Sequence, residues 1–495
     1  MDIRIIARSL FGRRWLQYYA AITCTIAMFI SGMTYVWPSP SLPKLMSRTS
    51  AIPITKDEGS WLASFTPVGD LFGAPLAAFT ADYFGRKNAI LIATVPYLIH
   101  WLIIYFASSL PHLLIARFLC GFADGQILTI LPMYIGEMAE YDIRGRLGNL
   151  ITVMADLGTL FVYCVGPYVS ITAMALLSCI FPIMVFILFY PMPDSPYYHL
   201  SKLDYLSASR SLRQFRGRDE VDEELVQLHQ VVTEQMIQPS TWGELFKNKT
   251  NLKALLIVIG LKSSQQLSGI SAFLVYSELI FTEAAGNIDP SISAMIFGFI
   301  QLVSSAFSAV AVDYIGRKPL LISSCIGSAV ALFAQGTYFY LLQHSYDVTG
   351  FKWVPLTSML LFIVMYCYGL GAIVFMMPSE MFPTNIKAKA LCLLDLYFAL
   401  TAFLVMKLFE VVSSNYGDHA PFYGFMVFTL MSIVFIVYCV PETKGKTLHE
   451  IQSILSGHES GFVSETKPLL PYKTAYPIIP CDTGTNNNRF YSRNI

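Results

Sequence analysis

The chain has 495 residues, of which 55% are hydrophobic, 14% aromatic and 13% charged, and its formal net charge at pH 7 is zero. The charged share is about half of the ~25% that soluble globular domains carry, which excludes an ordinary soluble fold. A net charge of zero gives no sign of a nucleic acid partner. The nine cysteines follow no CxxC or metal-ligand spacing, so we expect neither a disulfide framework nor a metal site.

The first predicted element is a basic N-terminal segment, 1–14, which precedes the first apolar run. That run is long enough to cross a membrane and lacks a small-residue cleavage site, so we expect a retained helix rather than a signal peptide. A membrane-spanning helix needs ~20 mostly apolar residues, and twelve stretches of the chain meet this condition. They are 15–38, 60–81, 88–109, 112–134, 147–168 and 171–191 in a first half, 15–191, and 253–281, 291–312, 319–343, 355–378, 388–412 and 421–440 in a second half, 253–440.

The connection after the second span has a counterpart of similar sequence after the eighth. Asp82-Tyr83-Phe84-Gly85-Arg86-Lys87 is followed 231 residues later by Asp313-Tyr314-Ile315-Gly316-Arg317-Lys318. In each copy the glycine allows a sharp turn, and the Arg-Lys pair favours the cytosolic side of a membrane. The aspartate one turn earlier offers the arginine a carboxylate partner. Two copies in register indicate an internal duplication of the kind found in transporters.

A polar segment, 192–252, separates the two halves, and acidic and basic residues are interleaved in it. Its apolar residues Leu225, Leu228, Val232 and Met236 recur at helical spacing. This periodicity predicts short amphipathic helices beneath the membrane domain, with a flexible linker as the alternative.

The tail, 441–495, is polar and rich in proline after Leu455, so we predict that it is mostly disordered. Within it, Glu465-Thr466-Lys467-Pro468-Leu469-Leu470 resembles an acidic dileucine signal. We therefore regard Glu465–Leu470 as a candidate contact for a sorting adaptor.

Basic residues gather on one side of a twelve-span arrangement. Besides the central segment, that side holds Arg86, Lys87, Arg144, Arg146, Arg317, Lys318, Lys387, Lys389, Lys444 and Lys446, whereas the other side holds Lys44, Arg48, Lys56 and Lys352. Because cytosolic connections carry the excess of Lys and Arg, we predict that both termini are cytosolic. We expect the plasma membrane, with an endosomal or lysosomal membrane as the alternative.

Several motifs follow one another in an order that is specific as a set. They are Arg117 with Gly121, Pro132-Met133-Tyr134-Ile135-Gly136-Glu137, Arg144-Gly145, Pro193-Asp194-Ser195-Pro196, Gln265-Gln266-Leu267-Ser268-Gly269-Ile270, Glu380 with Pro383, and Pro441-Glu442-Thr443-Lys444-Gly445-Lys446-Thr447-Leu448. From about residue 15 to 450 the chain resembles the sugar porter family of the major facilitator superfamily. Trp37-Pro38-Ser39-Pro40, the two repeated loops and Gln301 most resemble its insect facilitated trehalose transporter branch.

The resemblance implies an all-α membrane protein with twelve transmembrane helices in two six-helix halves and short cytosolic helices in the central loop. It also implies facilitative transport of a sugar, trehalose or a hexose, by alternating access and without a cofactor. Nothing in the chain forms a nucleophile–base set, metal cluster or phosphate loop, so we expect no enzyme.

Ten charged residues of these motifs are expected to form a cytosolic charge network. Unpaired charges near hydrocarbon are costly, so they should pair across spans. In the family such pairs lock the two halves together in the outward-open state and break in the inward-open state, whereas the alternative is that they only anchor helix ends. They are Asp82, Arg86, Arg117, Glu137, Arg144, Asp313, Arg317, Glu380, Lys387 and Glu442.

Carboxamides inside the spans are the candidate sugar contacts. Gln265 and Gln266 are adjacent within the seventh span, and Gln301 lies in the eighth. A carboxamide both donates and accepts hydrogen bonds, which suits a ring of hydroxyl groups; the alternative is hydrogen bonding between helices. By resemblance, Tyr276 would close the outer mouth of the site.

Three further candidate sugar contacts, Ser271, Thr152 and Phe375, depart from the family's pattern, as do some neighbouring positions. Ser271 stands where the family usually has Asn, Thr152 where it has Gln, and Phe375 where it has Trp, and Phe398-Ala399 replaces an Asn-Trp pair. Each sugar hydroxyl left without a partner would cost about 1–3 kcal/mol, so the site looks poorer for an ordinary hexose. In the tenth span Ala372 and Val374 replace prolines, which predicts a straighter helix.

The chain also gains two intramembrane carboxylates, Asp70 and Asp156, which are candidates for proton coupling or altered specificity. The first span has no acidic residue, which argues against proton coupling. Two alternatives to facilitated sugar transport therefore stay open. One is a diverged transporter for a polyol or an organic cation, and the other is a sugar sensor that does not transport.

Overall fold

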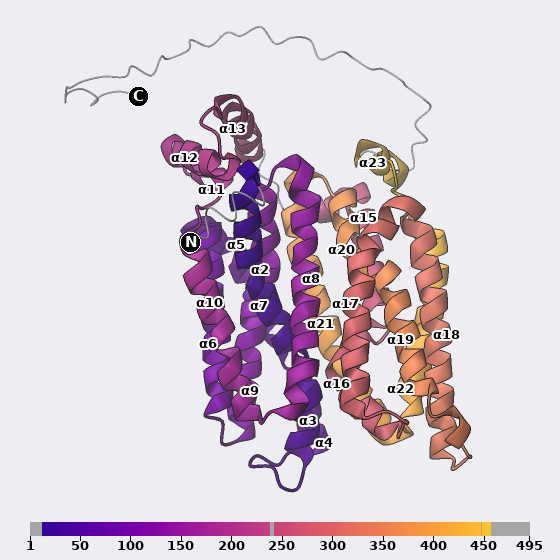
Figure 1. Ribbon diagram of the computed structural model, residues 1–495. Helices are drawn as coiled ribbons and strands as arrows, with labels where there is room; N and C mark the ends of the chain where they lie inside the picture. The colour runs from indigo at the N-terminus through magenta and orange to yellow at the C-terminus, as the bar shows by residue number, and fades with distance from the viewer. Residues whose placement is uncertain (1–11, 238–241, 447, 457–495) are drawn as a thin grey trace, which may run out of the picture. The chain divides into compact units, whose positions relative to one another are not determined.

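The computed structural model describes residues 12–237, 242–446 and 448–456, which lie within one compact unit, Met1–His458. The described residues form helices joined by short connections, with no β-strand among them. Figure 1 shows the helices of the first half in indigo to magenta and those of the second half in pink to yellow. The predicted sorting signal, Glu465–Leu470, lies outside the described residues.

The helices of the first half account for the first six predicted spans. They are α2 (Trp15–Val36), α3 (Pro38–Met46), α4 (Lys56–Ser64), α5 (Thr66–Phe84), α6 (Arg86–Tyr105), α7 (Leu110–Met138), α8 (Tyr141–Val165), α9 (Ile171–Ser178) and α10 (Ile180–Phe189). Helix α3 continues the first span beyond Trp37, where Pro38 occupies the first helical position. Helix α4 begins the second span earlier than predicted, because Thr55 and Glu58 form a capping box at its start.

The helices of the second half follow the same order. They are α15 (Lys249–Gln266), α16 (Ile270–Glu283), α17 (Pro290–Ile315), α18 (Arg317–Gln343), α19 (Val354–Tyr366), α20 (Ala372–Met381), α21 (Thr384–Tyr416) and α22 (His419–Cys439), followed by α23 (Leu448–Ser456).

The central segment is helical, as its periodicity predicts. It contains α11 (Pro196–Ser201), α12 (Tyr205–Arg216), α13 (Asp222–Ile237) and α14 (Trp242–Lys247). Val232 is buried against Leu200, and Leu225 and Leu228 pack on the same small cluster. The side chain of Met236 lies outside the described residues. An apolar stripe on α13 therefore fastens it to α11, so the described part of the segment before residue 238 packs as the amphipathic prediction expects.

Eleven stretches of helix among the described residues are long and apolar enough to cross a membrane, one fewer than the predicted twelve. The seventh span is missing from this set because it is divided into α15 and α16 at Leu267–Gly269. Gly269 has a φ of +92°, a conformation that residues with a side chain rarely adopt. In Figure 1 the two pieces lie at opposite ends of the unit, so together they make the twelfth crossing.

The tenth span runs through as one helical stretch but contains an irregular turn, and the straighter helix stays a prediction. Its two parts, α19 and α20, are joined by a π-helical turn, Cys367–Gly371. A Cβ on Gly369 would lie 2.4 Å from the Cβ of Ser324 on α18. The glycine thus lets the turn sit against α18, and π-helical turns of this kind are frequent at functional sites.

Helices α5 and α7 touch backbone to backbone because both carry glycine at the contact. A Cβ on Gly69 or Gly73 would lie 2.1 or 2.2 Å from a carbonyl oxygen of α7, and one on Gly121 would lie 1.8 Å from a carbonyl oxygen of α5. Small residues allow this approach in membrane helices. The contact brings the backbone of Asp70 against Gly125 of α7.

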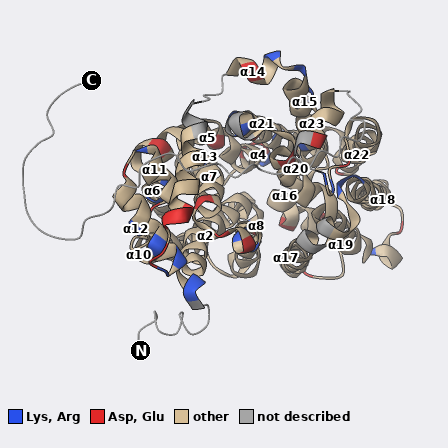
Figure 2. Ribbon diagram, turned by 90° about the horizontal axis from the view of Figure 1, so that it is seen from above, with Lys and Arg blue, Asp and Glu red and all other residues tan. Residues whose placement is uncertain are grey.

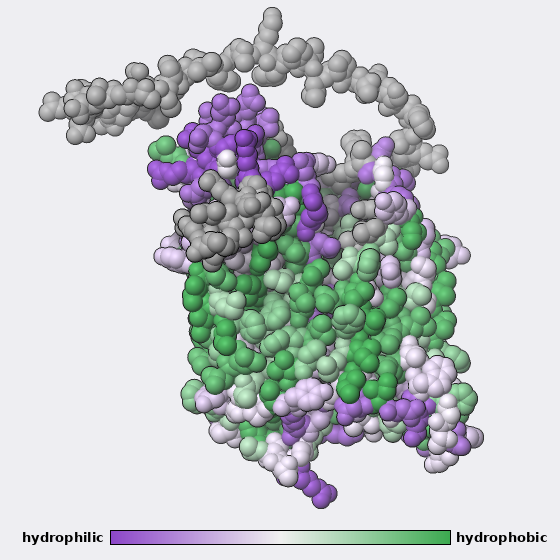
Figure 3. All heavy atoms as spheres, viewed as in Figure 1, coloured by the Kyte–Doolittle hydropathy of each residue, from purple (hydrophilic) through white to green (hydrophobic). Residues whose placement is uncertain are grey.

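The two ends of the helices differ in what connects them. We call the end with Gly85, Gly316 and α11–α14 the twin-loop end, which faces the viewer in Figure 2, and the end with α3 and α4 the opposite end. On the face seen in Figure 3, apolar side chains cover the surface between two polar ends. Such a band fits the hydrocarbon core of a bilayer, so this is a multi-pass membrane protein.

Candidate functional site

Arg86 of the first repeated loop holds two carboxylates of the first half. Its Nε lies 3.1 Å from a carboxylate oxygen of Glu137 on α7, and its Nη1 lies 3.3 Å from Asp82 one turn back. The side chains of Arg86 and Glu137 are only 11% and 15% exposed. A pair this deeply buried is costly to break, because each partner would leave an uncompensated charge.

A third carboxylate, Asp194, closes the same loop from the segment after α10. It accepts the backbone amides of Lys87 and Ser195 at 3.1 and 2.7 Å. Gly85 has a φ of +88°, and a Cβ there would lie 2.1 Å from Asp194. Burial raises the pKa of Asp194 above its usual range, although the two amides act in the opposite direction. Gly85 therefore serves both the turn and the space for this carboxylate.

The second repeated loop has the same construction. Arg317 donates to Glu380 on α20 from Nη2 at 2.9 Å and from Nε at 3.2 Å. Glu442, which follows α22, accepts the amides of Arg317 and Lys318 at 3.1 and 2.9 Å. Burial acts to raise the pKa of Glu442, but backbone amides hold it below its usual range. Gly316 takes the positive φ, +109°. The duplication predicted from sequence thus extends to the carboxylates on the neighbouring helices.

The described ion pairs of the two loops each stay within one half of the chain. Arg86 pairs with α5 and α7, and Arg317 pairs with α20. The predicted pairing across spans is therefore present, but these pairs do not join the first half to the second.

Arg117 does not belong to the cytosolic network that the sequence predicts. It lies near the start of α7, toward the opposite end, and its side chain is 1% exposed. Its guanidinium donates to the carbonyls of Leu62 and Ala63 in the last turn of α4, at 3.2 and 3.4 Å, and to the carbonyl of Thr34. Unsatisfied carbonyls at a helix C-terminus suit a cation, so Arg117 fastens α4 to α7.

Of the other three predicted members, only Arg144 and Lys387 have side chains that the structure describes. Arg144 is exposed and donates to the carbonyl of Ala139 at 3.4 Å, and Lys387 is half-buried. Neither forms an ion pair with the residues that the structure describes. The side chain of Asp313 lies outside them.

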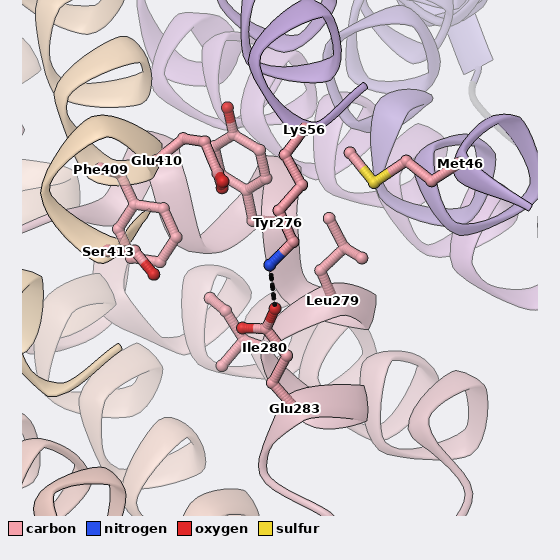
Figure 4. Close-up of a pocket in the computed structure, with 9 residues that line it drawn as sticks. All are labelled: Met46, Lys56, Tyr276, Leu279, Ile280, Glu283, Phe409, Glu410 and Ser413. Atoms are coloured by element: carbon pink, nitrogen blue, oxygen red, sulfur yellow. Dashed lines mark hydrogen bonds and ion pairs between the residues drawn. The ribbon is translucent and has the colours of Figure 1, made fainter. Parts of the chain in front are cut away.

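At the opposite end, ion pairs join the two halves. Lys56 of α4 lies 3.3 Å from Glu283 of α16, and Figure 4 shows this pair across a pocket. Lys407 of α21 lies 2.8 Å from Asp57, with its Nζ 4.3 Å from the ring centre of Trp61. In each pair α4 meets a helix of the second half.

Hydrogen bonds beneath these pairs close the same end. The hydroxyls of Ser39 on α3 and Ser277 on α16 lie 2.8 Å apart, and Tyr163 donates to the carbonyl of Leu274 at 2.7 Å. Tyr276 is 1% exposed and stacks on Phe409, with ring centres 5.2 Å apart. It lines the pocket of Figure 4, so it lies toward the opposite end, as its predicted role at the mouth requires.

The predicted glutamines are buried between the two ends. Gln265 donates to the carbonyl of Leu370 in the π-helical turn at 3.1 Å. Gln266 accepts from the hydroxyl of Ser271 at 2.6 Å, and Ser271 accepts in turn from Tyr35 of the first half at 2.9 Å. The structure thus brings Gln265, Gln266 and Ser271 together beside α2.

Gln301 reaches the first half directly. Its amide donates to the carboxylate of Asp156 on α8 at 2.8 Å. Several polar atoms of this central group have no hydrogen-bond partner among the described residues: Oε1 of Gln265, Nε2 of Gln266, Oε1 of Gln301 and Oδ2 of Asp156. Buried polar atoms without partners are expensive, so a polar ligand would find both donors and acceptors here.

Two predicted contacts, Thr152 and Phe375, lie apart from the buried glutamines. Thr152 is exposed on α8, one turn before Asp156, and Phe375 is 56% exposed on α20. Phe375 instead covers a residue that we did not single out, Lys262 of α15, whose Nζ lies 5.3 Å from its ring centre. Lys262 forms an ion pair with Asp395 of α21 at 3.1 Å.

The carboxylate of Asp70 also has an unforeseen neighbour. Asp124 on α7 is 3% exposed and accepts from the hydroxyl of Tyr97. One oxygen of Asp70 and one of Asp124 have no partner among the described residues. Asp124, Lys262 and Asp395 all lie within predicted spans, and an ionisable residue in a span is the signal that identifies them.

Comparisons with known proteins agree with this arrangement. A family model described as sugar (and other) transporter matches residues 41–455. The facilitated trehalose transporter Tret1 of Apis mellifera ligustica is 32% identical over 463 residues, which cover 92% of this chain and 92% of the relative. Tret1 of Polypedilum vanderplanki is 32% identical over 460 residues, covering 92% and 91%.

Among solved structures, the inward open conformation of the xylose transporter XylE from E. coli matches with a TM-score of 0.74. The match covers 88% of this chain and 99% of that chain at 23% sequence identity. At this identity the likeness concerns the fold, and it supports the assignment of twelve crossings in two halves.

Proposed function

Because the chain belongs to the sugar porter family of the major facilitator superfamily, we propose that it carries a sugar, trehalose or a hexose, across the plasma membrane. Transport is facilitative and proceeds by alternating access. The observation that carries the proposal is the central group of carboxamides with unpartnered atoms, buried where the two halves meet.

Sugar hydroxyls suit this group because each one both donates and accepts. Oε1 of Gln265 and Oε1 of Gln301 accept from the sugar, and Nε2 of Gln266 donates to it. Ser271 orients Gln266, and Tyr276 lies between the group and the opposite end. Thr152 and Phe375 are exposed in this conformation and contact the sugar from the side on which it leaves.

The conformation corresponds to the inward-facing state. The two halves are joined at the opposite end by Lys56–Glu283 and Lys407–Asp57, whereas the described ion pairs of Arg86 and Arg317 stay within their own halves. This assignment takes the twin-loop end as the cytosolic one, because that end carries the excess of basic residues. Both termini then face the cytosol. Glu465–Leu470 is available there to a sorting adaptor.

A second candidate function rests on the central carboxylates. Asp156 and the Asp70–Asp124 neighbours each keep an oxygen without a partner among the described residues. Such a set favours a cationic group or a proton, so transport of an organic cation, or proton-coupled transport, is the competing proposal. A sensor that binds sugar without moving it is the remaining one.

The test is counterflow in proteoliposomes that contain the purified protein, with labelled trehalose or labelled glucose outside. Vesicles are loaded with excess unlabelled trehalose, glucose or buffer, and no proton gradient is applied. We expect transient accumulation of label that depends on internal sugar. A variant with Gln265→Leu and Gln266→Leu should abolish it.

Each other outcome favours one competitor. Accumulation only with an imposed proton gradient indicates coupling. Binding of sugar without accumulation indicates a sensor, and binding of neither sugar, together with uptake of choline or another organic cation, indicates a diverged solute.

A further inference from the structure

An ion pair without an assigned role lies beside the carboxamide group. Nζ of Lys262 on α15 is 3.1 Å from a carboxylate oxygen of Asp395 on α21, and the two side chains are 2% and 35% exposed. The ammonium also lies 5.3 and 5.0 Å from the ring centres of Phe375 and Phe398. Lys262 is thus enclosed, whereas its carboxylate partner is reachable.

Lys262 shares a helix face with the glutamines. Residues three and four positions apart are neighbours on a helix surface, so the side chain of Lys262 lies one turn from Gln265 and Gln266. A second bond, 2.6 Å between the hydroxyls of Ser263 and Tyr397, holds α15 to α21 at the same level. The pair therefore belongs to the wall that continues from the carboxamides toward the twin-loop end.

Asp395 lies on a helix of the second half that packs against the first half. Helix α21 packs against α5, and the two lie side by side in Figure 2. Asp395 is close enough to Asp70 of α5 for the two carboxylates to repel each other. Asp395, whose side chain is 35% exposed, therefore lies near the interface between the halves.

Stability alone does not account for this pair. A buried ion pair is often no more stabilising than apolar side chains of similar volume. Here it occupies a wall of the site from which, by resemblance, a Trp and an Asn have been lost, with Phe375 and Phe398 at those positions. A carboxylate supplies strong hydrogen-bond acceptors in their place.

We propose that Asp395 is a further substrate-contacting residue, whose carboxylate accepts hydrogen bonds from sugar hydroxyls, and that Lys262 is the positioning residue that holds it. This inference rests on the proposed sugar transport. Asp395 offers its free oxygen to the sugar in the inward-facing state, while the aromatic rings keep the ammonium in place. Specificity then depends on hydroxyl donors and not on the charge of the solute.

The experiment measures KM and Vmax for counterflow of labelled trehalose and of labelled glucose with purified variants. Asp395→Asn should raise KM about 10- to 100-fold, as loss of a charged hydrogen-bond acceptor predicts, with a smaller change in Vmax. Lys262→Arg keeps a cation against the carboxylate and should stay near the wild-type KM. Lys253→Met, on the same helix but bonded to the carbonyl of Leu455, is the matched control.

A charge swap distinguishes a sugar contact by Asp395 from a purely structural role of the ion pair. In the double variant Lys262→Asp with Asp395→Lys the ion pair is kept, but the carboxylate moves to the enclosed position. We expect an unfolding temperature near wild type in detergent and a KM that remains raised. This variant also decides the matter if Asp395→Asn does not fold.

The swap overturns the inference if it restores the wild-type KM, because the pair then serves structure alone. An unchanged KM in Asp395→Asn overturns it as well. Failure of the proposed function looks different: the wild-type protein itself then shows neither counterflow nor a sugar-dependent rise in unfolding temperature, and the inference falls with it.

Discussion

The two ends of this transporter use charge for different purposes. At the twin-loop end, the described ion pairs of Arg86 and Arg317 connect helices of the same half, in two copies of one design. At the opposite end, Lys56–Glu283 and Lys407–Asp57 connect one half to the other. If the opposite end opens in the transport cycle that we propose, the second kind must break, whereas the first kind can travel with its half.

The burial of these pairs matches that division. Arg86 and Glu137 are 11% and 15% exposed, whereas Lys56 and Glu283 are 67% and 37% exposed. Solvent-exposed pairs contribute only about 0–1 kcal/mol, so they can open at little cost. The Lys56–Glu283 contact is thus weak, whereas Lys407, which is 15% exposed and also bonds Ser60, is held more firmly.

Removing the loop arginines tests the persistent pairs and has the largest expected effect. Arg86→Met leaves Glu137, and Arg317→Met leaves Glu380, without the guanidinium, so each should lower the free energy of unfolding by about 3 kcal/mol. Because the loops lie in separate halves, the losses should add to within about 0.5 kcal/mol. Denaturant unfolding in detergent measures both.

The control for these variants is Arg218→Met. Arg218 is 52% exposed and pairs with Glu224 at 3.0 Å, so its loss should cost under about 1 kcal/mol. A double loop variant that loses clearly less than the sum would mean that the two loops are coupled, which contradicts their independence.

The loop glycines should differ from each other, although both have positive φ. That conformation alone costs an alanine about 1–2 kcal/mol. Gly85→Ala also places a Cβ 2.1 Å from Asp194, whereas Gly316→Ala places one 3.3 Å from Glu442. We therefore expect Gly85→Ala to lower the unfolding temperature more than Gly316→Ala.

Gly148 provides the matched control, because it lies inside α8 and a Cβ there meets nothing within 4 Å. Gly148→Ala should leave the unfolding temperature unchanged or raise it. Equal effects of Gly85→Ala and Gly316→Ala would argue that only the backbone conformation matters.

Acidification should change the stability contributions of Glu442 and Asp194, one in each loop, in opposite directions. The pKa of Glu442 is depressed, so its contribution to stability is present above the unfolded value of about 4.3 and is lost as pH falls through the folded pKa. Glu442→Gln should therefore differ from wild type by about 1 kcal/mol at pH 7, with the difference shrinking below about pH 4.

Asp194 should behave in the opposite way. Its pKa is raised by burial, so its ionised form costs stability at neutral pH, and this cost is relieved as pH falls through the raised value. The deficit of Asp194→Asn relative to wild type should grow on acidification. Unfolding temperatures across a pH series report both variants, and parallel curves would refute the assignment.

The pairs at the opposite end give the smallest effect on stability and a clear effect on conformation. Glu283→Gln or Asp57→Asn should change the free energy of unfolding by less than about 1 kcal/mol, because these carboxylates are 37% and 73% exposed. Either should shift the population toward the outward-facing state by up to about fivefold, since each pair contributes at most that amount.

Labelling detects this shift. With Leu279→Cys in the pocket of Figure 4 and the native cysteines replaced, a thiol reagent applied from outside should react faster in both variants. Lys352→Met at the same end is the control. Unchanged rates would mean that these pairs do not hold the mouth shut.

The sequence predicts the spans well, because a bilayer demands long apolar runs that need no tertiary information. The sequence does not predict where individual spans are locally interrupted. The seventh span breaks at Gly269, and the tenth keeps a π-helical turn where Gly369 meets Ser324. Both depend on one residue in one place, which an average over ~20 residues conceals.

The candidate site is only partly visible in the sequence. Gln265, Gln266 and Ser271 come together because they are close along the chain, and the link from Gln301 to Asp156 appears only once α8 and α17 are packed. Arg117 was predicted at the wrong end of its helix, because a motif identifies a residue but does not give its depth in the membrane. Lys262 and Asp395 are 133 residues apart, so their pairing is a product of the fold.

The repeated loops also bear on how the protein is made. By the time residue 198 has left the ribosome, the first half holds the main partners of its own loop: Glu137 for Arg86, Asp194 for the turn at Gly85, and Tyr198 for the carbonyl of Tyr83. The first half can therefore settle in the membrane while the second is still being translated. The second half forms the corresponding contacts with Glu380 and then Glu442. The same order of insertion and loop closure therefore serves both halves.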